Sequence, residues 1–541
     1  MILTRRALLV GALGATISSA TAARGGLRLA DFGGGADGSD ASDAFARALA
    51  AAAENGAEIL LDEGTTRIVG APGAIVDAAA HDCPEVRHRS IRIRGLGARR
   101  SRLLCQPRPT AANPSLPVSR PILKSVGAEV FSLAELTLDG GMREPPRGLR
   151  QGRDPAAAAL VEVRGARRCE ISGIVVTGFA GHWDERDPIG GGYGRRGPLL
   201  LADCGDVRLD RVTLEHPTFR EGLFVHDARR VVVRGFRLSA VDGAARLSTP
   251  LHVIGPRTGT VEIEDLVAGP GWSGSLLNLG GPGHFALRRI RADGGASRFD
   301  PERGADPRSP TGGKGIDVGA EINGMLFPGQ AATESVGLED VVLDDVARYA
   351  IKATRDRHCP LRRLTLAANV RARVAGTALD AAFVDHVEGA VTAERRLGAA
   401  AGLPGILLRD CGGGVLAVDL TEGSEGVTRG DDGLSAAARA RAGFGVIRLR
   451  TGGLVLAGRI AGFSGGALLD DVAPGEDGLH DAVIEGLAVT MPGAGARPAL
   501  RLGRGPQRRL RVATVRHCRI DGEAIASDDP RVEIHALRVD G

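Results

Sequence analysis

The chain has 541 residues, a length that would ordinarily indicate about three or four domains. Its 79 glycines and an aromatic content of only 3% are unusual for large conventional cores, which rely on bulky rings. A stack of thin coils, each burying one face on its neighbours, needs few aromatics. The net charge of +4 is spread along the chain without a basic block, which argues against a nucleic-acid partner.

Residues 1–22 are expected to be an export signal and not part of the fold. The pair Arg5-Arg6 precedes an apolar run over residues 7–17, and residues 20–22 read Ala-Thr-Ala, a cleavage site. The pattern is typical of a twin-arginine signal, with an ordinary secretory signal as the alternative. Both predict a periplasmic or secreted protein, and loss of export in an R5K/R6K variant would identify the twin-arginine route. No later stretch reaches the ~18 apolar residues of a membrane span.

Seven cysteines occur, an odd number without any C-x-x-C pair, which argues against a disulfide framework and against a zinc site. Cys169, Cys204, Cys359 and Cys411 each stand at a turn that leads toward an alternating apolar run. We expect these four to be small buried residues without partners. Neither a metal site nor a cofactor is predicted, and the oligomeric state is not indicated.

Residues 23–58 are expected to form an N-terminal cap with a short helix. Asp31-Phe32-Gly33 is followed by Ala-Asp-Gly-Ser-Asp at 36–40, then by a helical pattern that stops at Asn55-Gly56. This order resembles the opening of the pectate-lyase-like superfamily of right-handed parallel β-helix proteins. The resemblance implies that the helix caps one end of a coil stack and that the relatives are carbohydrate-active hydrolases, lyases and epimerases.

From residue 59 to 541 the sequence repeats, which predicts one all-β domain, a parallel β-helix of about fifteen coils. Short strands of alternating apolar residues recur every 24 to 27 residues or so, joined by turns rich in Gly, Asp and Arg. Four loop excursions interrupt the period, and such loops are either functional or disordered. They lie at about 141–158, 179–197, 295–313 and 424–442.

Equivalent residues of successive coils become vertical neighbours ~4.8 Å apart. Aligning the first strand of each coil by its inward apolar pair places one outward residue between them. The resulting polar row reads Leu200, Phe224, His252, Asn278, Asp317, Lys352, Asp380 and Leu407, with Arg448 in the same phase further on. An ordinary solvent-facing strand surface is the alternative interpretation. Lys352 stands out because the chain has only two other lysines, Lys124 and Lys314.

Asp317 and Asp380 are the predicted catalytic pair. Two coils apart, their backbones should lie ~9–10 Å from one another, close to the ~6.5–9.5 Å carboxyl spacing of inverting glycosidases. Lys352 between them would favour the ionised form of at least one. His252 and Asn278 would hold substrate hydroxyls or a carboxylate. In the competing reaction, β-elimination on a uronic acid polymer, Lys352 or His252 would be the base, and Arg355 or Arg448 would bind the carboxylate.

The scarce large aromatics fall near the same coils and are candidate stacking platforms for sugars. Trp183 and Tyr193 lie in one excursion, Trp272 precedes the Asn278 strand, and Tyr349 precedes Lys352. Incidental packing is the alternative. His226 would share the outward face beside Phe224 and is a further candidate for substrate binding.

Three functions therefore stay open, all with a polysaccharide as partner. A glycoside hydrolase is favoured by the two carboxylates; a lyase or epimerase would use the basic residues; a non-catalytic β-helix would only bind the polymer. Exposed carboxylates on the polar row would favour an enzyme, and a covered face would favour a binding protein.

Overall fold

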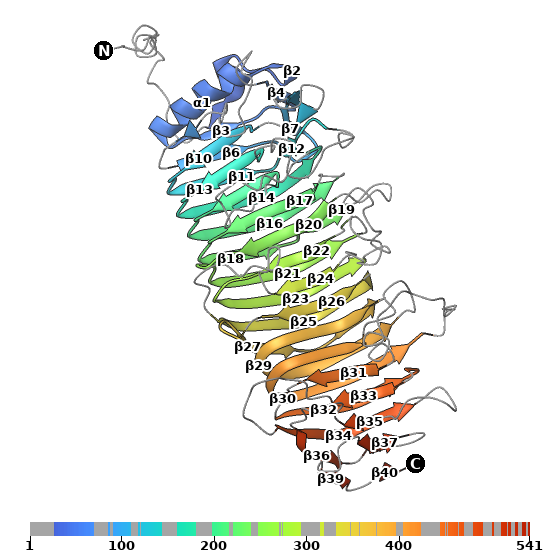
Figure 1. The fold of residues 1–541 in the computed structure, drawn as a ribbon. Coiled ribbons are helices and arrows are strands. Elements are labelled where there is room, and N and C mark those ends of the chain that lie inside the picture. Colours follow the sequence, from blue (N-terminus) through green and yellow to red (C-terminus); the bar gives the residue numbers. More distant parts are fainter. Residues whose placement is uncertain are drawn as a thin grey trace.

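In the computed structural model the chain is a single right-handed parallel β-helix (Figure 1), as the sequence predicts. Among the residues that the structure describes, thirty-eight strands belong to one hydrogen-bonded network, in which the pairings are parallel. The exception is an antiparallel pair outside that network, β8 (Arg108–Pro109) with β9 (Pro117–Val118).

The structure describes residues 26–69, 85–86, 90–109, 117–118, 121–142, 159–179, 197–215, 220–239, 247–269, 272, 274–293, 314–318, 332–346, 348–355, 357–374, 376–395, 404–423, 444–449, 451, 453–463, 465–469, 480–490, 500–502, 510–516, 518–520, 525–527, 533–536 and 539–540. The predicted export signal lies outside these residues, as do nearly all of the four excursions. Both stay predictions.

The strands stack into three ladders, and the first of them, called the first sheet below, carries the polar row. It runs through β5 (Glu85–Val86), β10 (Leu123–Val126), β13 (Val161–Arg164), β15 (Leu199–Ala202), β17 (Arg220–His226), β20 (Leu247–Ile254), β22 (Ser275–Leu279), β24 (Lys314–Val318), β26 (Tyr349–Thr354), β29 (Thr377–Arg395), β30 (Ile406–Glu422), β31 (Phe444–Leu449), β33 (Gly465–Leu469), β35 (Leu500–Leu502) and β38 (Ile525–Ser527).

The second ladder shares β29 and β30 with the first, because these long strands bend from one face to the next. Its other members are β1 (Leu27–Arg28), β3 (Glu58–Leu60), β6 (Ser90–Arg94), β11 (Val130–Ala134), β14 (Arg168–Thr177), β16 (Asp206–Glu215), β18 (Arg230–Arg234), β21 (Thr260–Ala268), β23 (His284–Asp293), β25 (Thr333–Val346), β27 (Leu361–Leu366), β32 (Leu454–Ala461), β34 (His480–Thr490), β36 (Leu510–Arg516) and β39 (Glu533–Ala536).

The third ladder uses the later halves of several long strands of the second. It adds β2 (Asp37–Asp40), β4 (Gly64–Ile68), β7 (Ser101–Cys105), β12 (Thr137–Asp139), β19 (Arg237–Ser239), β28 (Val370–Val374), β37 (Cys518–Ile520) and β40 (Val539–Asp540).

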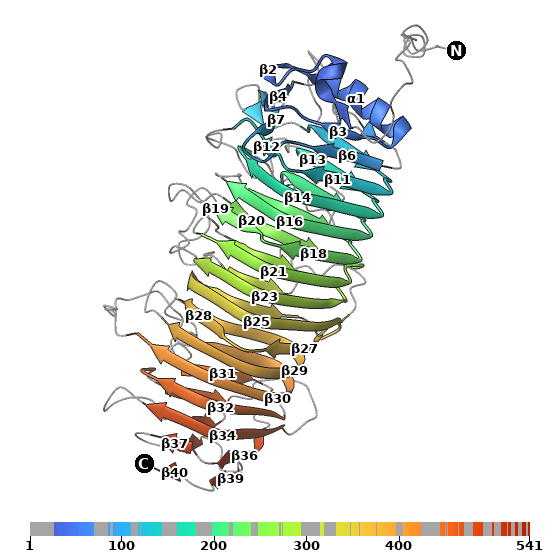
Figure 2. The same ribbon diagram turned by 180° about the vertical axis from the view of Figure 1, so that it is seen from behind.

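The N-terminal end of the stack is covered by α1 (Ser42–Asn55), which follows the short 3-10 helix η2 (Leu29–Phe32). The backbone N–H of Ser42 donates to Asp40, and the helix ends at Gly56, whose φ of +65° suits glycine. Its buried face includes Phe45 and Leu49, which join the core. Figures 1 and 2 show α1 at one end of the stack and β39 and β40 at the other.

The core is a column of aliphatic side chains inside the three ladders. On β17, Leu223 and Val225 are fully buried, and they pair in register with Leu251 and Val253 one coil later. Six cysteines of the described chain are buried, among them the four expected at turns. Burial raises the pKa of Cys204 to about 12, which keeps its thiol protonated.

Candidate functional site

The polar row has the predicted register along the first sheet. Backbone pairing joins its members in one continuous column: Leu200, Phe224, His252, Asn278, Asp317, Lys352, Asp380 and Leu407. No other coil intervenes among them, so Asp317 and Asp380 each lie one strand spacing, ~4.8 Å, from Lys352.

Arg448 does not belong to the row, which corrects the sequence alignment. Ile447 pairs with Leu407, and Arg448 pairs with the inward Leu408. The guanidinium is buried, with Nε donating to the Thr451 hydroxyl at 2.8 Å. Desolvation lowers the pKa of Arg448 to about 10. Because its donors are used inside the coil, Arg448 is a structural residue and cannot bind a substrate carboxylate at the row.

The row is also far less exposed than an outward strand face should be. Asp317 is 8% exposed, Asp380 3% and His252 0%, whereas Lys352 is half-buried. Strand alternation still sets these side chains opposite the core, since their neighbours Ile316 and Leu379 join the aliphatic column. The alternative interpretation of the row as an ordinary solvent-facing strand surface is therefore wrong for these residues, whose charged and polar groups are desolvated.

The carboxylate of Asp317 is held by cations. Lys314 Nζ lies 2.8 Å from Oδ2, and the Ser275 hydroxyl lies 3.3 Å from the same oxygen. Burial by itself raises the pKa of Asp317, but the charges of Lys314 and Lys352 and the two hydrogen bonds outweigh it. The net pKa is lowered, so Asp317 is ionised.

Asp380 has the opposite balance. Burial raises its pKa, and the charge and hydrogen bond of Arg409, whose Nη2 lies 2.9 Å from Oδ1, do not fully compensate. Lys352 lowers the pKa and the negative charge of Asp317 raises it further. The net pKa of Asp380 is raised, so this carboxyl is the one of the pair that more readily keeps a proton.

Sequence reasoning missed Ser275, Lys314 and Arg409, which set the charge of the two aspartates. The rarity of lysine could have found Lys314. All three lysines in fact stand on the first sheet, because Lys124 pairs with Glu162, and Glu162 pairs with Leu200 of the row. The column of row positions thus continues toward the N-terminus with a lysine and a buried glutamate.

His252 and His226 flank Phe224, a residue of the row. The Phe224 ring centroid lies 5.1 Å from that of His252 and 6.2 Å from that of His226, to which it is nearly parallel. Burial lowers the pKa of His226 despite the nearby carboxylate of Asp227. Phe224 and His252 thus form an aromatic segment of the row, with His226 beside it on β17, and the polar segment begins at Asn278.

Three other predicted binding residues have mixed placements. Asn278 is 6% exposed between His252 and Asp317 in the column. Tyr349 is half-buried beside Lys314, and the Arg348 guanidinium lies 5.1 Å from its ring centroid. Arg355 is buried, and its Nε donates to the Cys359 carbonyl at 3.0 Å, which makes it a turn-stabilising residue.

The aromatic platforms are only partly located. Trp272 is fully buried in the aliphatic core cluster, so it packs inside the fold and offers no surface to a sugar. The expectation for Trp272 is therefore wrong. Trp183 and Tyr193 lie outside the described residues.

Within the part of the chain that the structure describes, no three His, Cys, Asp or Glu side chains gather to form a metal site. Across the same residues, no helix is long and apolar enough to cross a membrane.

Comparison with known proteins gives likeness of fold only. No family model and no curated protein matches the sequence. Among solved structures, the chain is similar to a mannuronan C-5 epimerase A-module of Azotobacter vinelandii, with 14% identity, 95% and 99% of the two chains covered and a TM-score of 0.37. It is also similar to a GH87 alpha-1,3-glucanase of Streptomyces thermodiastaticus, with 11% identity, 97% and 70% coverage and a TM-score of 0.34. For tailspike protein 3 of bacteriophage CBA120 the values are 11%, 94% and 59%, and 0.37.

Proposed function

We propose that this protein hydrolyses a polysaccharide by acid–base catalysis at Asp317 and Asp380. The observation that carries the proposal is a pair of buried carboxyl groups with different partners: Asp317 contacts Lys314 and Ser275, which lowers its pKa, whereas Asp380 contacts Arg409 and its pKa stays raised by burial. Two carboxyl groups whose environments separate their pKa values can act as base and acid at one pH. Burying an ion pair contributes little to stability, so a desolvated charge cluster is better explained by function.

The reaction assigns one proton transfer to each residue. The protonated carboxyl of Asp380 donates to the glycosidic oxygen as the bond breaks, and the ionised carboxylate of Asp317 takes a proton from the attacking water. Their separation of two strand spacings, ~9–10 Å between backbones, leaves room for that water and favours inversion of configuration. Asn278 and His252, next along the column, would hold sugar hydroxyls.

The substrate we propose is a polymer that carries carboxylates. Lys314, Lys352 and Arg409 gather around the two aspartates, and cations at such a site favour anionic substrate groups. A protein exported by the signal predicted at residues 1–22 would meet such a polymer in the periplasm or outside the cell.

The test is to replace each aspartate by asparagine and measure the release of reducing ends. D317N and D380N should each reduce kcat by about 10²-fold to 10⁴-fold, the usual contribution of acid–base catalysis. D385N is the matched control, because Asp385 forms an exposed ion pair with Arg362. Full activity in both D317N and D380N, with unchanged folding, would refute the proposal.

One observation favours β-elimination as a second candidate. Lys352 stands between the two aspartates in the backbone register of the column, where its amino group could act as a base that removes a proton next to a substrate carboxylate. A lyase leaves an unsaturated product that absorbs ultraviolet light. Ultraviolet absorbance rising together with reducing ends, and lost in K352M, would select elimination over hydrolysis.

The low exposure of the aspartates favours a third candidate, a β-helix that binds a polysaccharide without cutting it. In that case the wild-type protein and the D317N/D380N double variant would bind the polymer with the same affinity. It would release no product from any glycan.

A further inference from the structure

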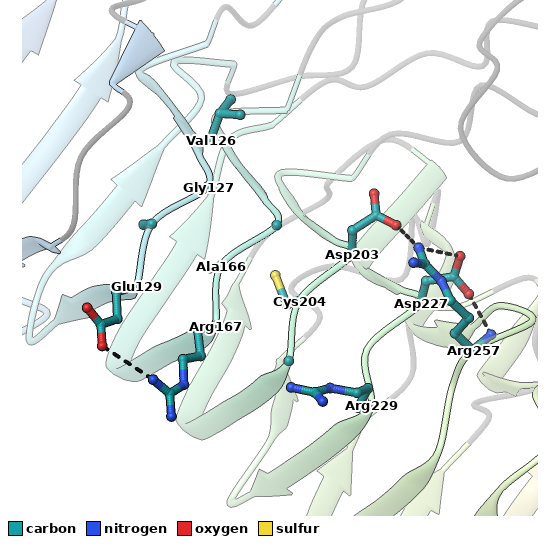
Figure 3. A pocket seen from close by; sticks show the side chains of 13 residues that line it. Val126, Gly127, Glu129, Ala166, Arg167, Asp203, Cys204, Asp227, Arg229 and Arg257 are labelled. Carbon is teal, nitrogen blue, oxygen red and sulfur yellow. Dashed lines mark hydrogen bonds and ion pairs between the residues drawn. The ribbon is translucent and has the colours of Figure 1, made fainter.

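A pocket lies beside the first sheet, toward the N-terminal end (Figure 3). Its volume is about 680 Å³, within the ~300–1,000 Å³ range of small-molecule sites. Turns of successive coils form it, at the ends of strands β10, β13, β15, β17 and β20. None of the proposed catalytic residues lines it.

The floor of the pocket is backbone with little side chain above it. Gly127 and Gly165 occupy the left-handed turn position, with φ of +70° and +64°. At Gly205 an added Cβ would lie 2.5 Å from the Arg167 carbonyl oxygen, so the turn tolerates only glycine without a shift. A ligand can therefore approach the chain closely here.

Two carboxylates replace glycine on the next two coils. Asp203 and Asp227 have φ of +56° and +55°, and both carboxylates contact the Arg257 guanidinium. Asp227 has a side chain only 7% exposed, and its Oδ1 also accepts the Arg257 backbone N–H at 2.9 Å. Figure 3 shows Asp203, Asp227 and Arg257 together on one side of the pocket. The carboxylates are thus held in place as hydrogen-bond acceptors for hydroxyl groups.

Two further arginines, Arg167 and Arg229, also line the pocket. Arg167 pairs with Glu129 at 3.4 Å. Arg229 is exposed, its Nη2 lies 3.1 Å from where a Cβ on Gly205 would stand, and no carboxylate of the described chain pairs with it. A guanidinium over a glycine floor, in the same pocket as fixed acceptors, can bind a carboxylate through two hydrogen bonds.

We infer that this pocket is a second saccharide site, which takes a uronate residue of the polymer that Asp317 and Asp380 act on. Arg229 binds the uronate carboxylate, and Asp203 and Asp227 accept its hydroxyls. The identity of the ligand rests on the proposed function. The coil of Asp203 lies four strand spacings, ~19 Å, from that of Asp317 along the column, so only a chain of several sugars reaches both.

The test is calorimetric binding of hexamers of mannuronate, galacturonate and glucuronate to the whole protein, with a glucose hexamer as the neutral probe. The D317N/D380N double variant is the host, which prevents turnover. R229Q should weaken binding of the preferred hexauronate by roughly tenfold or more, the value of a charged hydrogen bond. R208Q is the matched control, because Arg208 is an exposed arginine on β16 that does not line the pocket.

Three outcomes would overturn the inference: no hexauronate binds, the glucose hexamer binds equally well, or R229Q binds like R208Q. The proposed function would survive each of them if D317N and D380N still abolish turnover of the polymer by the otherwise unaltered protein. Conversely, binding that depends on Arg229 without any turnover of a polymer would support the pocket and refute the catalytic proposal.

Discussion

At the level of single residues, Asp317 and Asp380 differ in the cations that their carboxylates contact. Asp317 is bonded to Lys314 and to the Ser275 hydroxyl, whereas the bond of Asp380 comes from Arg409. Both are buried, so small differences in pairing decide the protonation state. The sequence could place the two aspartates in one column, but it could not reveal Arg409 as a partner. Alternation determines the face of the sheet on which a residue lies, and it does not determine which residue of the next coil a long side chain contacts.

These pKa shifts predict a bell-shaped dependence of kcat/KM on pH. Activity falls at low pH when Asp317 is protonated and at high pH when Asp380 loses its proton. K314Q removes a cation that lowers the pKa of Asp317, so the acidic limb should move to higher pH. R409Q removes a cation that lowers the pKa of Asp380, so the alkaline limb should move to higher pH. Profiles of kcat/KM for the wild type and both variants measure this, and unmoved limbs would contradict the assignment of base and acid.

At the level of strands, alternation of apolar residues predicted the register of the row from Leu200 to Leu407. The prediction failed at β31, where Val446 and Ile447 are both apolar, so that alternation does not determine which of them points into the core. Arg448 can lie inside the coil there because Thr451 and the Val483 carbonyl accept its hydrogen bonds. The inward or outward direction of a strand residue can therefore be predicted from one sequence only where polar and apolar residues alternate without interruption.

Close stacking of coils makes some glycines indispensable, and Gly389 provides the sharpest test. A Cβ at this position would lie 1.8 Å from the Leu366 carbonyl oxygen, and the φ is +115°. G389A should therefore lower the free energy of unfolding by about 3 kcal/mol, as overpacking does. Gly486 is the control: its φ is +65° with nothing within 4 Å, so G486A should cost only about 1 kcal/mol. Urea denaturation measures the free energy of unfolding of both variants. Equal losses of stability in G389A and G486A would contradict the close approach of the coils at Gly389.

At the level of the whole molecule, the repeat and the N-terminal motif were sufficient to predict the β-helix and its capping helix. They could not predict that the row residues on the outer face are buried. Periodicity predicts the direction in which a side chain points, and it does not predict what covers that side chain. The same limit explains Trp272, which stands at a turn in sequence but packs into the core. The pocket at the turns was missed for a related reason, since its residues come together only when five coils are stacked.

The central claim is that the face carrying Asp317 and Asp380 cuts a polysaccharide. The most direct measurement incubates the purified protein with acidic and neutral glycans and reads reducing ends and ultraviolet absorbance together, with the D317N/D380N double variant as the blank. The account predicts new reducing ends from a carboxylate-bearing glycan with the wild type alone, without a rise in absorbance. Product formation by the double variant at the wild-type rate, or no product from any glycan, would contradict it.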